Sequence, residues 1–387
     1  MLNFLCHIPT RVLFGRNQIE QLAEEVKRYS RRILVVTGRE SVKKYGIYQR
    51  AAGILKKAGI TYFDLSGIKP NPLLSRVYEG IELCRKENID FVLAVGSGSV
   101  IDTAKTIAAG VKYKGDVWDF YLKKAKPRDC LGVGTVLTLA AAGSETSVNA
   151  VITNEKTQRK LAFGSFLIRP KFSILDPVYT FTVPRIHSAA GIVDIMSHVF
   201  EQYFSPTRSA GVQDRISEAI LKTCIHYGPV VLKEPKNYEA RANIMWAGSL
   251  ALNGFLGLGK IEDWATHRIE HEVSAIYDLT HGIGLAIIFP NWMKYVLNEE
   301  AVPMFSDYGN NVWGLGRNKN PLEISKQAIL KTKGFFAGLG AAVSLKEAGI
   351  NEERLEEMSK KAVSFGELGE VKKLNDRDVL NILKMSL

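Results

Sequence analysis

The fold is decided by residues 91–102, which read Phe91-Val92-Leu93-Ala94-Val95-Gly96-Ser97-Gly98-Ser99-Val100-Ile101-Asp102. Five apolar residues in a row that end at a glycine are typical of a strand buried on both faces of a parallel sheet. The apolar spacing from Ile101 to Gly110 predicts a helix directly after the glycines. A strand, a glycine turn and a helix in this order predict an α/β domain.

The same alternation of strands and helices continues on both sides of this stretch. Further strands are predicted at residues 32–37, 133–137 and 172–175, and helices at residues 19–29, 48–58 and 74–87. Beyond Pro184 the strand-like runs largely vanish, and helical patterns follow at residues 188–204, 214–226 and 239–252. We therefore predict an α/β domain with a mostly parallel sheet at residues 1–183 and an all-helical domain at residues 184–387.

The composition is that of an ordinary globular protein. The chain has 387 residues, of which 46% are hydrophobic and 24% charged, and its apolar runs are too short to span a bilayer. The four cysteines are scattered, which fits a reducing cytoplasm. The net charge of +11 would suit nucleic acid, but basic and acidic residues alternate along most of the chain. We expect neither a nucleic-acid partner nor a membrane partner.

The glycines of the opening stretch indicate a phosphate site. Gly96 and Gly98 let a phosphate approach the backbone, and the free N–H groups of a helix start attract anions. Ser99 and Asp102 have the spacing of a capping box. Ile101 replaces the third glycine of the Rossmann fingerprint, so a standard Rossmann site is not expected. A turn without any ligand is the alternative, and spacing alone does not decide between the two.

Five of the seven histidines fall between residues 198 and 281, and four of these are His198, His267, His271 and His281. Asp194 and His198 are four residues apart in a predicted helix and leave the same face, and His267 and His271 repeat this spacing. Such pairs on neighbouring helices can build a metal site, and three nitrogens with one oxygen suit Zn(II) or Fe(II). Spacing leaves open whether His271 or His281 is the fourth ligand. A salt-bridged surface pair is the alternative for each motif.

Together these motifs resemble the iron-containing (group III) alcohol dehydrogenases, and most closely their butanol dehydrogenase branch. The resemblance extends along essentially the whole chain and depends on two long patterns. The first pattern comprises Ser173-Ile174-Leu175-Asp176, Pro184, Asp194 and Glu201. The second comprises Trp264-Ala265-Thr266-His267-Arg268-Ile269-Glu270-His271 and Thr280-His281-Gly282-Ile283-Gly284. The implied fold is the one that this family shares with dehydroquinate synthase: a dinucleotide-binding α/β domain followed by a helical, metal-binding domain.

The resemblance also implies roles for individual residues. The implied metal ligands are Asp194, His198, His267 and His281. His271 then lies beside the reacting centre, where it can take part in proton transfer. The implied cofactor residues are Gly96, Ser97, Gly98, Ser99 and Asp102 of the glycine loop, with Asn71, Thr138 and Lys160. The family's Gly-Thr-Gly-Ser-Glu segment reads Ala141-Ala142-Gly143-Ser144-Glu145 here, so one hydroxyl contact to the cofactor is missing.

The implied activity is hydride transfer between NAD(P)H and a small aldehyde or primary alcohol held by Fe²⁺ or Zn²⁺. Gly38 stands where NAD-preferring relatives have an acidic residue, and Arg39 and Ser41 can hold a phosphate, so NADP(H) is favoured over NAD(H). Glu40 argues against this preference. The family implies a homodimer. The rival interpretations are a glycerol dehydrogenase-like polyol oxidoreductase, a dehydroquinate synthase-type lyase, and a nonenzymatic metal- or nucleic-acid-binding protein.

Overall fold

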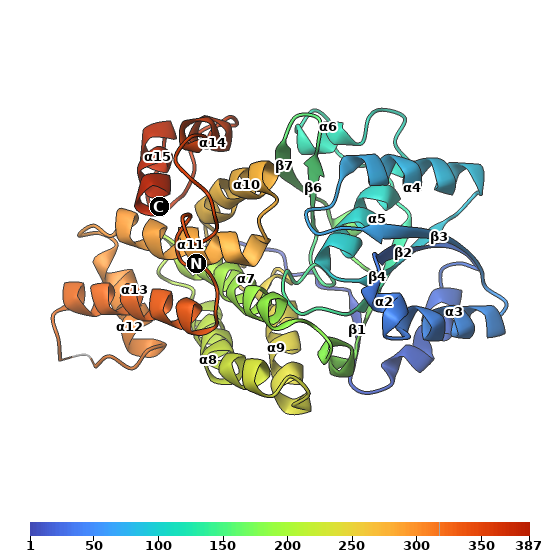
Figure 1. Ribbon diagram of the computed structural model, residues 1–387, viewed down its shortest axis with the longest axis horizontal. Helices are drawn as coiled ribbons and strands as arrows, with labels where there is room; N and C mark the ends of the chain where they lie inside the picture. The colour runs from blue at the N-terminus through green and yellow to red at the C-terminus, as the bar shows by residue number, and fades with distance from the viewer. Residues whose placement is uncertain (317) are drawn as a thin grey trace. The chain divides into compact units, whose positions relative to one another are not determined.

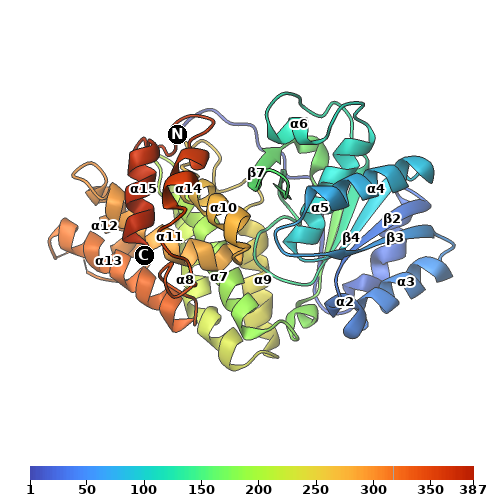
Figure 2. The ribbon, with the colours of Figure 1, turned by 45° about the horizontal axis from the view of Figure 1, so that its top comes forward.

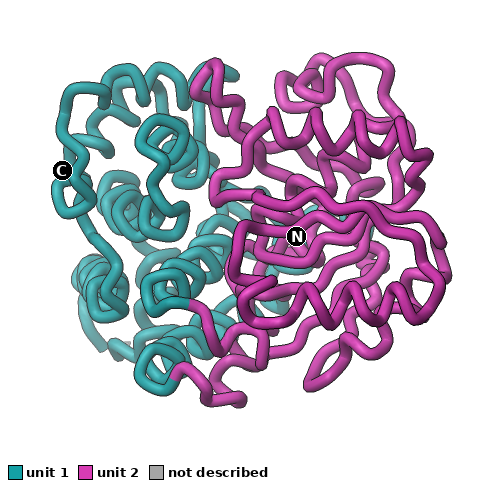
Figure 3. Tube along the Cα trace, turned by 45° about the vertical axis from the view of Figure 1, so that its right-hand side comes forward, with its two compact units in different colours: residues 1–6, 184–234, 254–387 teal, residues 7–183, 235–253 magenta. Residues whose placement is uncertain are grey.

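The computed structural model describes residues 1–316 and 318–387, which form two compact units (Figure 3). Unit 1 consists of residues 1–6, 184–234 and 254–387, and unit 2 of residues 7–183 and 235–253. A new unit begins at Pro184, where the sequence predicts a domain boundary. Residues 235–253 differ from the sequence prediction, because they belong to the unit that contains the sheet rather than to the helical one.

Unit 2 is built on a six-stranded parallel sheet with the strand order β1-β8-β5-β4-β2-β3. Its strands are β1 (Arg11–Phe14), β2 (Arg32–Gly38), β3 (Thr61–Ile68), β4 (Phe91–Gly96), β5 (Gly132–Leu137) and β8 (Phe172–Leu175). Two further strands, β6 (Asn149–Asn154) and β7 (Arg159–Gly164), form a separate antiparallel hairpin. The parallel sheet predicted from the sequence is confirmed.

Helices cover both faces of this sheet (Figure 2). They are η1 (Gln18–Gln21), α1 (Leu22–Lys27), α2 (Ser41–Lys44), α3 (Ile47–Lys57), α4 (Leu74–Lys86), α5 (Gly98–Val111), α6 (Trp118–Tyr121), η2 (Phe166–Ile168), η3 (Pro177–Thr180) and α9 (Tyr238–Ala251). Leu34 and Val92 pack with α4 and α5, whereas Ile33 and Leu93 pack with α1 and α3. Alternate residues of a strand point to opposite faces, so a sheet covered on both sides requires the continuous apolar runs of β2 and β4.

The strand order contains a switch point between β2 and β4 (Figure 1). After β2 the chain continues to β3 on one side, and after β4 it continues to β5 on the other side. In open α/β sheets, ligands bind outside the carboxyl ends of the strands at such a point. Gly38 and Gly96 are the last residues of these two strands, so the topology brings both to the expected binding edge.

Unit 1 is helical in the part of the chain that the structure describes. Its helices are α7 (Arg185–Tyr203), α8 (Gly211–Lys233), α10 (Ala265–Tyr277), α11 (His281–Val296), α12 (Val302–Asn311), α13 (Pro321–Gly338), α14 (Leu355–Ala362) and α15 (Asp376–Met385). Helix α7 is buried along its whole length from Ser188 to Tyr203 and contacts α8 and α11. Polar residues on α7 therefore need partners inside the unit. Among the described helices, none has the length and apolar character needed to cross a membrane.

Candidate functional site

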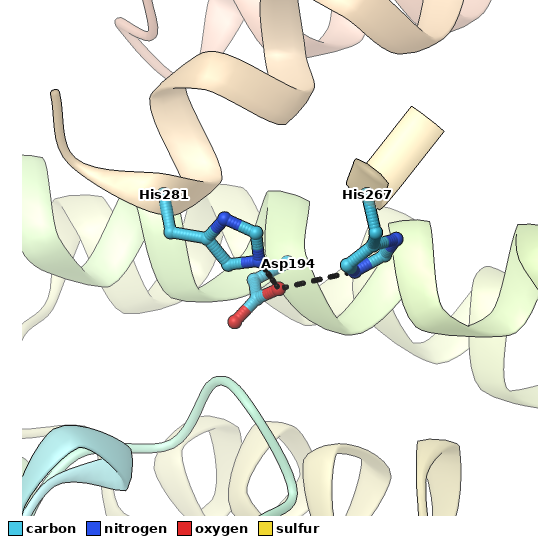
Figure 4. A group of neighbouring side chains, drawn as sticks. All are labelled: Asp194, His267 and His281. Atoms are coloured by element: carbon cyan, nitrogen blue, oxygen red, sulfur yellow. Dashed lines mark ion pairs between the residues drawn. The ribbon is translucent and has the colours of Figure 1, made fainter. Parts of the chain in front are cut away.

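The candidate metal ligands come from three helices of unit 1. Asp194 and His198 lie on α7, His267 lies on α10, and His281 is the first residue of α11. Figure 4 shows the side chains of Asp194, His267 and His281 pointing toward one another. The ligand atoms of these three residues all lie within 4.8 Å of one another. Residues that are far apart in sequence thus meet at one point of the helical unit.

One carboxylate oxygen of Asp194 is close to all three candidate histidines. Its Oδ1 lies 3.3 Å from Nδ1 of His198, 4.0 Å from Nε2 of His267 and 3.7 Å from Nε2 of His281. Two ligands that bind one tetrahedral metal at about 2.1 Å lie roughly 3.4 Å apart. The ring of His198 lies beside this group, with its centre 4.6 Å from that of His267. Asp194, His267 and His281 are therefore neighbours at nearly the separations that one metal ion requires, and His198 adjoins this group through its ring.

The Nδ1 atom of each of these three histidines faces an oxygen. The partners are the backbone oxygen of Asp194 at 2.8 Å for His198, Oε1 of Glu201 at 2.8 Å for His267, and Oε2 of Glu270 for His281. A neutral imidazole that donates from Nδ1 keeps a lone pair on Nε2, which is the usual arrangement of a metal-binding histidine. Nε2 of His267 is buried and makes no hydrogen bond with the described residues. This donor set fits a divalent metal.

The charges around the cluster also favour a cation. Glu201 and Glu270 are completely buried. Burial, and after it the charge of Glu201, raises the pKa of Glu262 and raises that of Asp263 to about 6. Burial, followed by the charges of the neighbouring histidines, holds the pKa of His198 well below 6.5 and keeps its ring neutral. The two buried carboxylates that face His267 and His281, beside the neutral imidazole of His198, favour a bound divalent cation.

Two positions close to His281, 282 and 284, have no room for a side chain larger than glycine. A Cβ atom on Gly282 would lie 2.0 Å from the backbone oxygen of Ala190 in α7, so only glycine lets α11 begin this close to α7. A Cβ atom on Gly284 would lie 2.6 Å from Oε1 of Glu270. The first glycine thus places His281 near α7, and the second leaves room for the carboxylate that holds its ring.

His271 lies next to the cluster. Its ring centre is 5.6 Å from that of His281. With Glu270 and His281 it forms a second group whose ligand atoms all lie within 4.8 Å of one another. His271 is also buried, with 8% of its surface exposed. It is therefore close enough to contribute either to metal binding or to proton transfer.

Sequence reasoning gave no role to Glu201 or Glu270, and it placed Trp264 among residues that could line a small apolar pocket. Glu201 lies three residues after His198 in a buried helix, so its place on the same face was a usable signal. Glu270 precedes His271 on α10, and only the structure pairs it with His281. Trp264 has a left-handed backbone (φ 59°), which is unusual for a bulky residue, and its ring centre lies 5.1 Å from that of His267.

The candidate cofactor residues gather at the carboxyl ends of the strands of unit 2. The backbone N–H of Thr138 donates to the oxygen of Gly96, at a distance of 3.0 Å. A Cβ atom on Gly96 would lie 2.6 Å from Val100, and one on Gly98 would lie 3.0 Å from Ala142. The turn is therefore too tight for larger residues, as a loop that approaches a phosphate requires.

The expected capping box of Ser99 and Asp102 is wrong. Helix α5 begins at Gly98 with Ser97 as its N-cap, and no side chain caps it. The carboxylate of Asp102 instead accepts hydrogen bonds from Oγ of Ser144 at 2.5 Å and from the backbone N–H of Val151 at 3.0 Å. Ser97 thus leaves the first N–H groups of α5 without a side-chain cap, as an anion site at a helix start requires.

The other candidate cofactor residues flank this loop. Asn71 is buried and has a left-handed backbone (φ 51°). The residue after it accepts a hydrogen bond from β6, whose partner strand β7 carries the buried Lys160. Gly38 ends β2, and Arg39 and Ser41 follow it as exposed residues. Asn71 and Lys160 are thus linked by one short stretch of backbone pairing.

Both halves of the chain match models of known families. Residues 9–177 match the model described as iron-containing alcohol dehydrogenase, and residues 188–387 match the C-terminal model of the Fe-containing alcohol dehydrogenase family. The chain is 51% identical to NADH-dependent butanol dehydrogenase A of Clostridium acetobutylicum over 100% of both chains. It is 38% identical to the NADPH-dependent aldehyde reductase YqhD of Escherichia coli over 96% of both. The crystal structure of NADH-dependent butanol dehydrogenase A from Thermotoga maritima is similar with a TM-score of 0.96 and 39% identity, covering 100% of this chain and 99% of that one.

Proposed function

Because the chain belongs to the iron-containing alcohol dehydrogenase family, in its butanol dehydrogenase branch, we propose that it interconverts small aldehydes and primary alcohols with NAD(P)H. The observation that carries the proposal is the group of three histidines whose Nδ1 atoms face oxygens and which gather around Asp194. The matches along the whole chain favour this activity over a glycerol dehydrogenase-like or dehydroquinate synthase-type one.

The proposed metal ligands are Asp194, His198, His267 and His281. Three imidazole nitrogens and one carboxylate oxygen suit Fe²⁺ or Zn²⁺. A divalent metal held there supplies a Lewis acid that polarises the carbonyl oxygen of the aldehyde. Glu201 and Glu270 keep the rings of His267 and His281 in the orientation and tautomer that binding requires.

His271 is the proposed proton-transfer residue. Interconversion of an aldehyde and an alcohol moves one proton to or from the alcohol oxygen in addition to the hydride. The ring of His271 is buried beside His281, so it can hold that proton near the oxygen that the metal polarises.

The proposed cofactor site is the carboxyl edge of the sheet in unit 2. The uncapped start of α5 offers its N–H groups and the positive end of its dipole to the diphosphate of the cofactor. Asn71, Thr138 and Lys160 lie along the same edge and are proposed to contact the rest of the molecule. Asp102 is proposed to shape the loop from beneath, because both of its carboxylate oxygens accept hydrogen bonds from the protein.

For cofactor choice we propose NADP(H) over NAD(H), on the basis of Gly38, Arg39 and Ser41. Gly38 offers no carboxylate to repel the 2′-phosphate, and Arg39 is exposed next to it. Glu40 and the NADH-dependent name of the 51% identical relative weigh against the preference. We therefore expect kcat/KM for NADPH to exceed that for NADH by only a small factor. Arg39→Ala should lower kcat/KM for NADPH and leave the value for NADH unchanged. A strong preference for NADH that Arg39→Ala does not alter contradicts this choice.

Small apolar substrates are proposed because of Trp264. Its half-buried ring lies edge-on to the rings of His267 and His198, with centres 5.1 and 6.0 Å apart. An indole beside two metal ligands offers an apolar wall to a short alkyl chain.

A panel of aldehydes of increasing chain length, assayed with NADH and with NADPH, tests the proposed activity. Oxidation of the cofactor that depends on a short aldehyde such as butanal is the expected result. A dehydroquinate synthase-type lyase regenerates its NAD within each turnover and gives no net change in absorbance. Dihydroxyacetone reduced faster than butanal would instead indicate a polyol oxidoreductase.

A homodimer in a reducing cytoplasm completes the proposal. Strand β1 lies at an edge of the sheet, and Leu2, Phe4 and Leu5 are exposed apolar residues near the amino terminus. The four cysteines are all free, as expected in a reducing compartment. Light scattering should give twice the chain mass of 43.0 kDa.

A further inference from the structure

A lysine on the helix that follows the glycine loop of unit 2 makes no ion pair with a carboxylate among the residues that the structure describes. Lys105 on α5 is completely buried. Its ammonium donates to Oγ of Ser144 at 3.0 Å, to the backbone oxygen and Oγ of Ser147 at 3.0 and 3.2 Å, and to the backbone oxygen of Asn149 at 2.8 Å. All these acceptors are uncharged. Burying an ammonium costs free energy that an apolar side chain would not, so packing alone does not explain a lysine here.

All these acceptors lie in one segment, residues 144–149, and Asp102 holds the same segment. Ser144 accepts from Lys105 and donates to Asp102 at 2.5 Å, so one hydroxyl joins the two charged residues. The other carboxylate oxygen of Asp102 accepts from the N–H of Val151 at 3.0 Å. Lys105 and Asp102 are one turn apart on α5. Together they fasten the segment to the first turns of the helix whose start forms the proposed phosphate site.

The segment is also fastened to α9. Oγ of Ser249 donates to the carboxylate of Glu145 at 2.6 Å, and Oγ1 of Thr146 donates to the backbone oxygen of Ser249 at 2.8 Å. Gly143 has a left-handed backbone (φ 60°), and a Cβ atom there would lie 2.7 Å from the oxygen of Gly248. A Cβ atom on Gly98 of the loop would lie 3.0 Å from Cβ of Ala142, so the residues directly before this segment pack against the loop.

We propose that Lys105 is a positioning residue for the dinucleotide. It holds residues 141–149, which we call the wall of the site, in place, and it adds a buried positive charge to the helix whose start receives the diphosphate. Lys105 acts through Ser144, Ser147 and Asn149 and does not itself contact the cofactor. The inference rests on the proposed function, because it assumes that this loop binds the nicotinamide dinucleotide.

Because Lys105 is titratable, dinucleotide affinity and stability should both depend on pH. Burial lowers the pKa of Lys105 to about 8, although the carboxylates of Asp102 and Glu145 raise it in part, and Arg169 lowers it further. Above pH 8 the ammonium loses its charge and one donor, so dinucleotide affinity should fall. Stability should change in the opposite direction. An unfolded lysine titrates near 10.5 and binds more protons between pH 8 and 10.5, so the free energy of unfolding rises in that range.

The test is titration of the full chain with NADH and NADPH, followed by fluorescence, for wild type and Lys105→Met. We expect Lys105→Met to weaken binding about tenfold at pH 7, because charged hydrogen bonds to the wall are lost. Metal content should stay unchanged. The loss of affinity above pH 8 should occur in wild type and be absent from the variant.

A matched control is Lys260→Met in unit 1. Lys260 is also a buried lysine, and it donates to Asp214 at 2.6 Å. This variant should lose stability and bind the dinucleotide as wild type does. If Lys105→Met fails to fold, Ser144→Ala is used instead, because it keeps the lysine and removes the link to Asp102, with an expected loss of roughly threefold.

Two results would overturn the inference. In the first, the Lys105→Met variant binds the dinucleotide as tightly as the Lys260→Met variant does. In the second, the Lys105→Met variant still loses affinity above pH 8. Wild type that binds no dinucleotide at all would instead contradict the proposed function. The two failures are therefore distinguishable.

Discussion

Glu270 is proposed to orient the metal ligand His281 without binding the metal itself, and its substitution tests this role. Its carboxylate bonds to Nδ1 of His281 and is completely buried. Glu270→Gln keeps the shape of the side chain and removes its negative charge. That charge makes Nε2 of His281 a stronger electron-pair donor to the metal. We expect metal affinity to fall by about tenfold or more, measured by competition with a chelator of known affinity.

Glu218→Gln is the matched control for this prediction. Glu218 is a buried carboxylate of the same unit, and it accepts a hydrogen bond from the hydroxyl of Tyr203 at 2.9 Å instead of holding a histidine. Its replacement should lower stability and leave metal affinity unchanged. Equal metal affinities for the Glu270 and Glu218 variants would show that Glu270 has only a structural role.

His267 and His271 lie one turn apart on α10, and their substitution by alanine should have different consequences. His267→Ala should lose the metal, because its Nε2 is a proposed ligand atom. His271→Ala should keep the metal and lose a rate factor of ~10²–10⁴ or less, with a changed pH profile, because positioned proton transfer contributes about this much. Metal content and pH–rate profiles of both variants are the measurement.

The alternative ligand assignment has its own signature. His271 and His281 form a group with Glu270 whose ligand atoms lie within 4.8 Å of one another, so a metal could be held there instead. A metal-free His271→Ala together with a His281→Ala that retains metal would refute the proposed ligand set. A His271→Ala variant with an unchanged pH profile and only lower stability would remove the proposed role in proton transfer.

At the level of elements, the start of α11 controls where His281 lies. A Cβ atom on Gly282 would clash with the backbone of Ala190, which cannot move far because α7 is buried on all sides. Gly282→Ala should therefore displace α11, cost ~1–3 kcal/mol of stability and weaken metal binding. Thermal unfolding with and without added metal measures both effects.

Gly334→Ala on α13 serves as the control for this substitution. Apart from its chain neighbours and the backbone of its own helix, no atom of the described residues lies within 4 Å of a Cβ placed on Gly334, which lies inside α13. Alanine should stabilise the helix there by about 0.5–1 kcal/mol without changing metal affinity. A Gly282→Ala variant that keeps its stability and its metal affinity, as the control does, would contradict the close approach of α11 to α7.

Elements with a strong periodic pattern could be predicted from the sequence, and the others could not. Helices α3, α4 and α7 begin and end within about three residues of the predicted ranges, because their apolar residues recur at helical spacing. Strands β1, β3, β6 and β7 were not predicted. β1 and β3 lie at the two edges of the sheet, and β6 and β7 form a two-stranded hairpin, where polar residues interrupt the apolar pattern.

The same distinction applies to the site. The spacing of His267 and His271 suggested a ligand pair, and only the resemblance to a family named His281 in place of His271. The partners of the ligands were beyond reach of the sequence, because Glu270 and His281 are brought together by the packing of α10 on α11. The tight turn from β4 into α5 was recognisable from its glycines, and its role as a phosphate site stays a prediction. The inward direction of the Asp102 side chain depends on Ser144 and Val151.

At the scale of the whole molecule, the division into units does not follow the sequence in two simple halves. Helix α9 has helical segments before and after it, so the sequence assigned it to the helical domain. Its Ser249 bonds to Glu145, and its Met245 belongs to the core around α5. Long-range contacts of this kind leave no local pattern, because either unit could bury the apolar face of an amphipathic helix.

Each unit carries one of the two proposed sites, and activity requires both. Unit 1 holds the histidine and carboxylate cluster, and unit 2 holds the glycine loop. Loss of either site should abolish turnover while the other continues to bind its own ligand. Metal content and dinucleotide affinity are therefore independent readouts of the account.

Turnover is proposed to depend on one divalent metal held by Asp194, His198, His267 and His281. Metal analysis and NAD(P)H-dependent reduction of an aldehyde on one preparation, before and after chelation, test it most directly. We expect one metal per chain, parallel loss of metal and activity, and recovery of both with Fe²⁺ or Zn²⁺. A preparation that is free of metal and fully active would contradict it.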